Sequence, residues 1–142
     1  MTFEVQGDAV VTTVEVRYAE TDQQGVAYHA NFLVWMEIGR TKHLEALGFP
    51  YARLEAGGLL FSVLEACCRY AGAARYGERV RIATRVVAQR SRTVTFGYEI
   101  DAAGRPLASG ETTLIALDSR RRPRRIPAEV AAALARGPAE PA

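Results

Sequence analysis

The sequence predicts an α+β protein in which one long helix covers one face of a mainly antiparallel sheet. An alternating strand pattern near the N-terminus is followed by a single long helical pattern, and four more strand patterns follow the glycine pair Gly57–Gly58. The short link at residues 90–92 requires its flanking strands to pair antiparallel. One helix hides only part of a sheet and leaves an edge strand bare, so we expect two or more copies to associate.

The composition is that of one globular domain. The chain has 142 residues, of which 49% are hydrophobic and 24% are charged, and this is enough for a single core. We expect one domain over residues 1–142, with 137–142 as a loose tail. No apolar run is long enough to cross a bilayer, and Met1–Asp8 lacks the basic start of a signal peptide. A cytoplasmic protein without a membrane span is therefore expected.

The cysteines, histidines and clustered arginines limit the kinds of site. Cys67 and Cys68 are adjacent within an apolar run, which favours buried structural thiols over a disulfide or a nucleophile. His29 and His43 lack the close spacing of a metal-binding set, so no metal is expected. The arginine-rich segment 120–125 is interpreted as a solvated connection, with an anion site for phosphates or nucleic acid as the alternative. We expect no nucleic-acid partner.

The first strand and the long helix have the clearest patterns. Val10–Tyr18 alternates between apolar and polar residues, which predicts a strand with one buried side. From about Ala30 to Leu47, apolar residues recur every three or four positions, which predicts a helix. This stripe consists of Phe32, Trp35, Met36, Gly39, His43, Ala46 and Leu47. Gly48 and Pro50 are stop signals that end the helix.

The second half of the chain predicts four strands and a terminal helix. The strands are expected at 59–70, 79–89, 93–101 and 107–117. Residues 102–106 contain a glycine and a proline and are expected to form the turn between the last two strands. Residues 127–136 predict a short helix with Pro127 at or near its first turn.

The segment between the first strand and the long helix carries the chemistry. Asp22 supplies a carboxylate, Gly25 permits a tight turn, and His29 stands at the helix start, where backbone N–H groups have no internal partner. A carboxylate beside the positive end of a helix can split an acyl bond without a serine or a metal. An aspartate that only caps nearby amides is the alternative for Asp22. The chain has no Gly-x-Ser-x-Gly elbow, P-loop or dinucleotide fingerprint.

The motif Tyr18-x-x-Thr21-Asp22-x-x-Gly25-x-x-Tyr28-His29-x-Asn31-Phe32 resembles that of the hotdog-fold acyl-CoA thioesterases. More specifically, it is similar to the 4-hydroxybenzoyl-CoA thioesterase-like family, which includes the small bacterial thioesterases associated with the Tol–Pal system. The resemblance extends from about Val14 to Pro127. It implies the hotdog fold, a long central helix wrapped by a five-stranded, mainly antiparallel sheet.

The resemblance implies a catalytic group of three residues. Asp22 is expected to attack the thioester carbonyl or to activate water for that attack, and the backbone amide of His29 is expected to stabilise the oxyanion. The His29 imidazole is either a proton donor to the leaving thiolate or a packing side chain. Tyr28 belongs to this group chiefly by shaping the loop. Glu37, on the helix, is the rival catalytic carboxylate, and Glu65 is a further candidate.

The same resemblance implies a substrate-binding group. Gly25 lets the backbone turn or approach the substrate, and Asn31 shapes the pocket, caps the helix or bonds across a subunit boundary. Arg90 and Arg92 flank the turn where the resemblance places contacts to coenzyme A, whose phosphates suit guanidinium groups. The acyl group is expected in an apolar pocket where subunits meet, near residues 59–62.

The implied activity is hydrolysis of an acyl-CoA to a carboxylic acid and free CoA. No cofactor is expected, because CoA is part of the substrate. The expected partners are the acyl-CoA, a homotetramer (dimer of dimers) or homodimer, and an acyl-carrier protein as another thioester donor. One alternative is a hydratase or dehydratase that uses His29 on acyl-CoA or acyl-carrier protein. Another is a non-catalytic module that binds acyl-carrier protein or nucleic acid.

Overall fold

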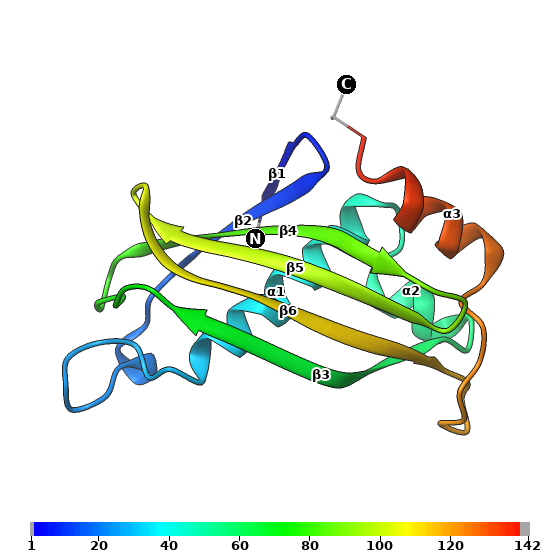
Figure 1. The fold of residues 1–142 in the computed structure, drawn as a ribbon, viewed down its shortest axis with the longest axis horizontal. Coiled ribbons are helices and arrows are strands. Elements are labelled where there is room, and N and C mark those ends of the chain that lie inside the picture. The colour runs from blue at the N-terminus through cyan, green and yellow to red at the C-terminus, as the bar shows by residue number, and fades with distance from the viewer. Residues whose placement is uncertain (1, 140–142) are drawn as a thin grey trace.

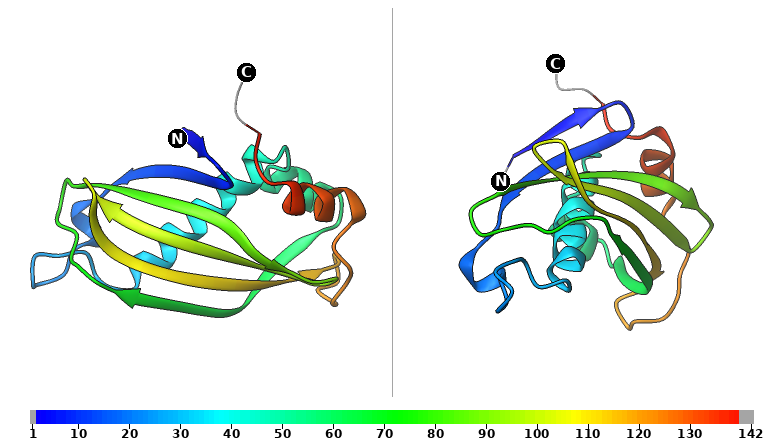
Figure 2. Two further views of the ribbon diagram at one scale, coloured as in Figure 1. Left: turned by 45° about the horizontal axis from the view of Figure 1, so that its top comes forward. Right: turned by 60° about the vertical axis from the view of Figure 1, so that its left-hand side comes forward.

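The computed structural model describes residues 2–139, which contain six strands in one antiparallel sheet (Figure 1). The strands are β1 (Phe3–Gln6), β2 (Ala9–Glu15), β3 (Leu60–Tyr70), β4 (Arg79–Gln89), β5 (Thr93–Ala102) and β6 (Arg105–Leu117). Their order across the sheet is β1-β2-β4-β5-β6-β3, so β1 and β3 form its two edges. The sheet curves around one long helix (Figure 2).

This long helix is α1 (Asn31–Ala46), which lies along the concave face of the sheet. Phe32, Trp35 and Met36 are buried between helix and sheet. At Gly39 the helix backbone comes so close to β4 that a Cβ atom would clash with Thr84 Oγ1 and lie 2.8 Å from Ile82 Cγ2. A glycine is therefore needed for the helix to pack this closely against the sheet.

Three shorter helical segments complete the chain. The single-turn 3-10 helix η1 (Tyr18–Glu20) follows β2, and α2 (Tyr51–Ala56) follows α1. Near the C-terminus, α3 (Ala128–Arg136) buries Val130, Ala133 and Leu134, and the Gln89 side chain donates a hydrogen bond to the Ala131 carbonyl (3.1 Å). Among residues 2–139, no helix combines the length and the apolar character needed to cross a membrane.

The predicted α+β class and element order are confirmed, with three differences. The sheet has six strands instead of five, because β1 pairs with β2 through the turn at Gly7. This strand is too short to give a clear alternating pattern. The first predicted strand ends earlier, at Glu15, since Tyr18 already begins η1. Helix α2 was not predicted. Pro127 is the N-cap of α3, which agrees with its predicted place at or near the first turn.

The prediction of two buried cysteines was wrong. Cys67 is exposed and Cys68 is half-buried. They lie on β3, an edge strand on which Phe61 and Cys68 pack against the core, while Val63 and Leu64 are exposed. In the predicted C-terminal tail, residues 137–139 form neither helix nor strand, and residues 140–142 lie outside the described part.

His43 is a buried histidine with an incomplete hydrogen-bond set. Its Nδ1 lies 3.1 Å from the carbonyl oxygen of Thr84, so Nδ1 carries the proton and donates it. Its Nε2 has no partner among residues 2–139. Burial lowers the pKa of His43 below its ordinary value of 6.5, and the Thr84 bond and the negative charge of Asp8 offset this only in part.

We therefore expect acid to destabilise the protein through His43. The unfolded chain takes up a proton near pH 6.5, whereas the folded chain does so only at lower pH, so the free energy of unfolding falls as the pH drops below about 6.5. Urea unfolding at several pH values between about 7 and 5 measures this slope, the change of the free energy of unfolding with pH. His43→Gln should flatten it. Equal slopes in wild type and His43→Gln would contradict the assignment.

Candidate active site

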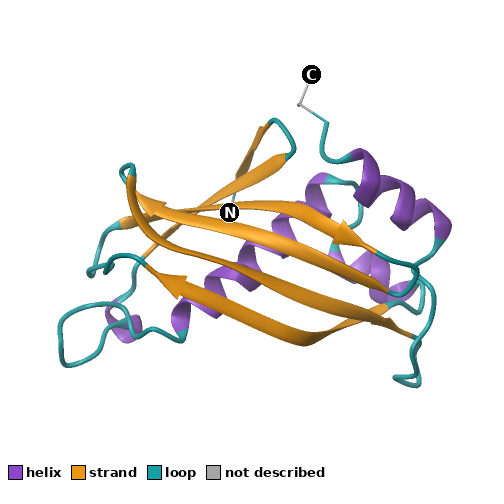
Figure 3. Ribbon diagram, in the orientation of Figure 1, coloured by secondary structure: helices purple, strands orange, loops and turns teal. Residues whose placement is uncertain are grey.

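The Asp22 loop, residues 21–30, joins η1 to α1 at one end of the sheet (Figure 3). Its two arms are held together by main-chain bonds: Thr21 bridges Ala27, and the Asp22 N–H donates to the Val26 carbonyl (2.9 Å). Gly25 turns the chain with a φ of +79° and donates its N–H to the Asp22 carbonyl (3.0 Å). The turn role predicted for Gly25 is confirmed, since side chains rarely adopt this conformation.

Asp22 is half-buried at the start of this loop. Its Oδ1 accepts a hydrogen bond from the Gln24 N–H (2.8 Å), which is the local amide capping considered as the alternative role. Within residues 2–139, its Oδ2 accepts no hydrogen bond. One oxygen therefore holds the carboxylate in place while the other is available to a substrate.

The N-terminus of α1 closes the loop. Asn31, Phe32 and Leu33 donate their N–H groups to the carbonyls three residues earlier, at 2.9, 3.2 and 3.1 Å, so the first turn forms around His29 and Ala30. Among the described residues, nothing accepts a hydrogen bond from the N–H of His29 or Ala30, and no side chain caps the helix. These N–H groups carry the partial positive charge of the helix end. They can therefore stabilise negative charge that develops on a nearby substrate oxygen.

Aromatic rings surround His29. The Tyr28 ring lies 4.5 Å from the imidazole and the Tyr70 ring 6.1 Å, measured between ring centres. The Tyr70 hydroxyl donates to the His29 carbonyl (2.9 Å). Partial burial, with a contribution from Cys68, raises the pKa of Tyr70 to about 12, so the phenol stays protonated as a donor at neutral pH. Strand β3 thus supports the start of α1, a contact that sequence analysis missed.

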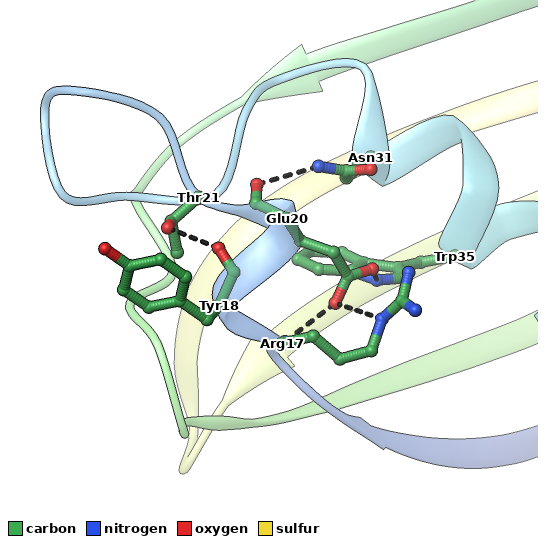
Figure 4. Close-up of polar contacts among 6 residues, drawn as sticks. All are labelled: Arg17, Tyr18, Glu20, Thr21, Asn31 and Trp35. Atoms are coloured by element: carbon green, nitrogen blue, oxygen red, sulfur yellow. Dashed lines mark hydrogen bonds and ion pairs between the residues drawn. The ribbon is translucent and has the colours of Figure 1, made fainter.

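Glu20 connects the loop to the helix (Figure 4). Its carboxylate is buried and accepts hydrogen bonds from the Trp35 indole N–H (3.1 Å) and the Arg17 main-chain N–H (2.8 Å). The Arg17 guanidinium lies 3.5 Å away. Glu20 was not predicted as a site residue, although a buried tryptophan one turn into the helix needs an acceptor for its N–H.

Asn31 acts differently from one of its predicted roles. It is the first residue of α1, and the N-cap is Ala30, so the prediction that Asn31 caps the helix was wrong. Its side-chain amide donates to the Glu20 carbonyl instead (2.8 Å). The Tyr28 N–H donates to the same oxygen (2.8 Å), so Tyr28 and Asn31 both hold the returning arm of the loop.

Arg90 and Arg92 lie at the opposite end of the sheet. The Arg92 carbonyl accepts the Ala116 N–H, and this end of β6 pairs with Leu60 at the start of β3. His29 contacts Tyr70 at the other end of β3, and the loop that carries Asp22 lies at that end of the sheet (Figure 1). Eleven strand residues at about 3.3 Å each separate the two ends. The chain by itself therefore does not bring the two arginines to the Asp22 loop.

More arginines gather at the far end. The Ser91 carbonyl accepts the Ile126 N–H, which places segment 120–125 beside the turn that carries Arg90 and Arg92. Asp118 pairs with Arg122 (3.4 Å), and hydrogen bonds from the Arg122 and Arg120 amides help to hold the pKa of Asp118 below its usual range. This end of the molecule is strongly basic.

A cavity of about 290 Å³ opens between the C-terminal half of α1 and the sheet. Its apolar walls come from Leu44, Phe61, Phe96 and Leu114, and its polar lining from Glu37, Arg40, Thr41 and Tyr51. The rival carboxylate Glu37 therefore lines a cavity, whereas Glu65 lies in a groove on the outer face of the sheet. Among residues 2–139, no three histidine, cysteine, aspartate or glutamate side chains are placed to hold a metal ion.

A family model described as the thioesterase-like superfamily matches residues 16–134. The chain belongs to this superfamily. The match includes the Asp22 loop, α1 and the strands β3 to β6, so the family resemblance seen in the motif is confirmed. The architecture of the thioesterase-like chain, a helix wrapped by a curved antiparallel sheet, is the hotdog fold.

Two proteins similar in sequence to this chain have names that describe acyl-CoA thioesterases. "Putative acyl-CoA thioesterase YneP" of Bacillus subtilis is 44% identical over 87 residues, which cover 61% of this chain and 63% of YneP. The match thus spans less than two thirds of that relative. "Acyl-CoA thioesterase YbgC" of Haemophilus influenzae is 30% identical over 122 residues, which cover 84% of this chain and 90% of YbgC.

Two solved structures share the fold. The hypothetical protein TT1821 from Thermus thermophilus is 40% identical with a TM-score of 0.86, and the match covers 88% of this chain and 96% of TT1821. The DHNA-CoA thioesterase from Staphylococcus aureus is 34% identical with a TM-score of 0.78, and the match covers 81% of this chain and 78% of that enzyme.

Proposed function

We propose that this protein is an acyl-CoA thioesterase that hydrolyses an acyl-CoA to a carboxylic acid and free CoA. The observation that carries the proposal is the pairing, in one loop, of the Asp22 carboxylate with the unoccupied N–H of His29 at the helix N-terminus. The names of YneP, YbgC and the DHNA-CoA thioesterase support the same activity. No cofactor takes part, because CoA belongs to the substrate.

The chemistry needs two groups on opposite sides of the thioester carbonyl. An Asp22 oxygen attacks the carbonyl carbon, or takes a proton from a water that attacks it. Negative charge then develops on the carbonyl oxygen, where the His29 N–H stabilises it. The C–S bond breaks and the CoA thiolate takes up a proton. If Asp22 attacked directly, water then hydrolyses the mixed anhydride to release the acid.

The complete site forms between two copies of the chain. Within residues 2–139, no strand pairs with the outer edge of β3, and Val63 and Leu64 on this strand are 45% and 60% exposed. Antiparallel pairing of β3 with the same strand of a second copy gives hydrogen-bond partners to the main-chain N–H and C=O groups of this edge. It also brings the Tyr70 end of one copy beside the Leu60 end of the other. A homodimer of this kind, or a tetramer of two such dimers, is the assembly we propose.

In such a dimer, two parts of each substrate-binding site come from the second copy. The apolar cavity beside Phe61 lies at the Leu60 end and would receive the acyl group of a thioester bound at the first copy's Asp22. Arg90 and Arg92, at the same end, would bind the CoA phosphates, because guanidinium groups pair with phosphate oxygens through two hydrogen bonds. The Tyr28, Gly25 and Asn31 contacts to substrate come from the first copy.

We expect Asp22→Asn to abolish most of the activity. The amide keeps the side-chain shape and an oxygen for the Gln24 N–H, but it neither attacks nor accepts a proton, so kcat should fall by about 10²- to 10⁴-fold. The measurement is thiol release from short, long and aromatic acyl-CoAs.

Glu37→Gln is the matched comparison, because it changes the rival carboxylate in the same way. Full activity in Asp22→Asn together with loss in Glu37→Gln would transfer the catalytic role to Glu37. No thiol release by wild type from any acyl-CoA or acyl-carrier-protein thioester would overturn the proposed function.

We expect the shared site to show complementation between defective copies. The double variant Arg90→Ala/Arg92→Ala should raise KM for acyl-CoA roughly tenfold or more, because phosphate contacts are lost. When it is co-expressed with Asp22→Asn, each mixed dimer contains one site with both an intact Asp22 and intact arginines. Activity should then recover to about half of wild type per dimer. Purification through two different tags isolates the mixed dimer, and its failure to recover activity would place both parts of the site in one copy.

A further inference from the structure

Glu20 is a buried carboxylate surrounded by donors. Its side chain is 7% exposed, and carboxylates are rarely buried to this extent unless they are paired. Oε2 accepts the Trp35 indole N–H, and Oε1 accepts the Arg17 main-chain N–H and faces the Arg17 guanidinium (Figure 4). Both oxygens are thus occupied by hydrogen bonds to Trp35 and Arg17.

The main chain of the same residue holds the other arm of the loop. The Glu20 carbonyl accepts the Tyr28 N–H and the Asn31 side-chain amide, both at 2.8 Å. Asp22 follows Glu20 by two residues, and His29 follows Tyr28 directly. The helix, the outgoing arm and the returning arm therefore all meet at one residue.

We propose that Glu20 is the positioning residue of this site, which fixes the distance between the Asp22 carboxylate and the His29 amide without touching the thioester. The proposal rests on the function proposed above. Holding reacting groups in place matters because a displacement of about 1 Å can cost roughly 10²-fold in rate. Glu20 limits such displacement because it stands at the start of the outgoing arm and is hydrogen-bonded to helix α1 and to the returning arm at Tyr28.

The position requires a carboxylate and not an amide. The groups that face the Glu20 side chain are all donors: an indole N–H, a main-chain N–H and a guanidinium. A carboxylate presents two acceptor oxygens, whereas glutamine presents one oxygen and one NH₂ group. In Glu20→Gln the glutamine NH₂ group therefore faces an N–H group of Trp35 or Arg17 inside a buried site, so one hydrogen bond is lost with almost no change in shape.

We expect Glu20→Gln to lower kcat about 10- to 100-fold with KM changed less than about twofold, because the acyl and CoA contacts stay in place. Trp35→Phe removes the indole donor, keeps an aromatic ring and should act in the same direction. Glu55→Gln, at an exposed position on α2, is the matched control and should behave as wild type. Variants that melt earlier but keep wild-type kcat would show a purely structural role and overturn the proposal.

Coupling to Asp22 tests whether Glu20 acts through the loop. In the Asp22→Asn background, Glu20→Gln should cause a much smaller further loss than it does in wild type, because the group that it positions is already missing. If the two losses multiply in full, Glu20 acts independently of Asp22 and the proposal is wrong.

Hydrogen exchange supplies a test that does not depend on activity. In Glu20→Gln the main-chain amide of Tyr28, which donates to the Glu20 carbonyl, should exchange faster, while the amides of β4 and β5 keep the wild-type rate. Unchanged exchange at Tyr28 would show that the Glu20 side chain does not hold the loop and would overturn the proposal. If wild type hydrolyses no thioester, the proposed function fails, and the exchange result still decides whether Glu20 holds the loop.

Discussion

The packing of α1 against the concave sheet is the contact on which the rest of the structure depends. Gly39 lets the helix lie against Ile82 and Thr84, and this fixes the helix along its length. Its first turn then presents the unoccupied amides of His29 and Ala30, Trp35 meets the Glu20 carboxylate, and Leu44 lines the cavity. One helix thus supplies the anion-binding end, the support of the loop and the wall of the pocket.

The Asp22 loop and the arginine-rich end lie at opposite ends of the molecule. A carboxylate that attacks a thioester works best away from guanidinium groups, which would pair with it and reduce its reactivity. CoA phosphates need those groups, and the long strand β3 keeps the two apart within a chain. In the antiparallel dimer proposed above, one CoA thioester reaches from the acid of one copy to the arginines of the other, and the length of its pantetheine arm keeps the phosphate-binding arginines away from the reacting carbonyl.

The sequence predicted the fold and the loop well, because both depend on local patterns. Alternation gave β4 with the observed bounds, and the apolar stripe gave α1 to within one residue at each end. Gly25 was identified as a turn residue because glycine permits a tight turn, and its positive φ agrees with this. What failed depends on tertiary neighbours: the exposure of Cys67 follows from the edge position of β3, and the burial of Glu20 follows from Trp35. The distance between Arg90 and Asp22 is likewise set by strand order.

The bonds that shape the Asp22 loop are formed largely by main-chain groups. Gln24 holds the Asp22 carboxylate through its N–H, and the tip residues Gln23 and Gln24 are exposed. Their side chains can therefore be exchanged without altering the carboxylate's support. A loop built in this way can diversify at its tip while its chemistry stays constant, which makes the segment a natural place for evolution, or a designer, to change substrate preference.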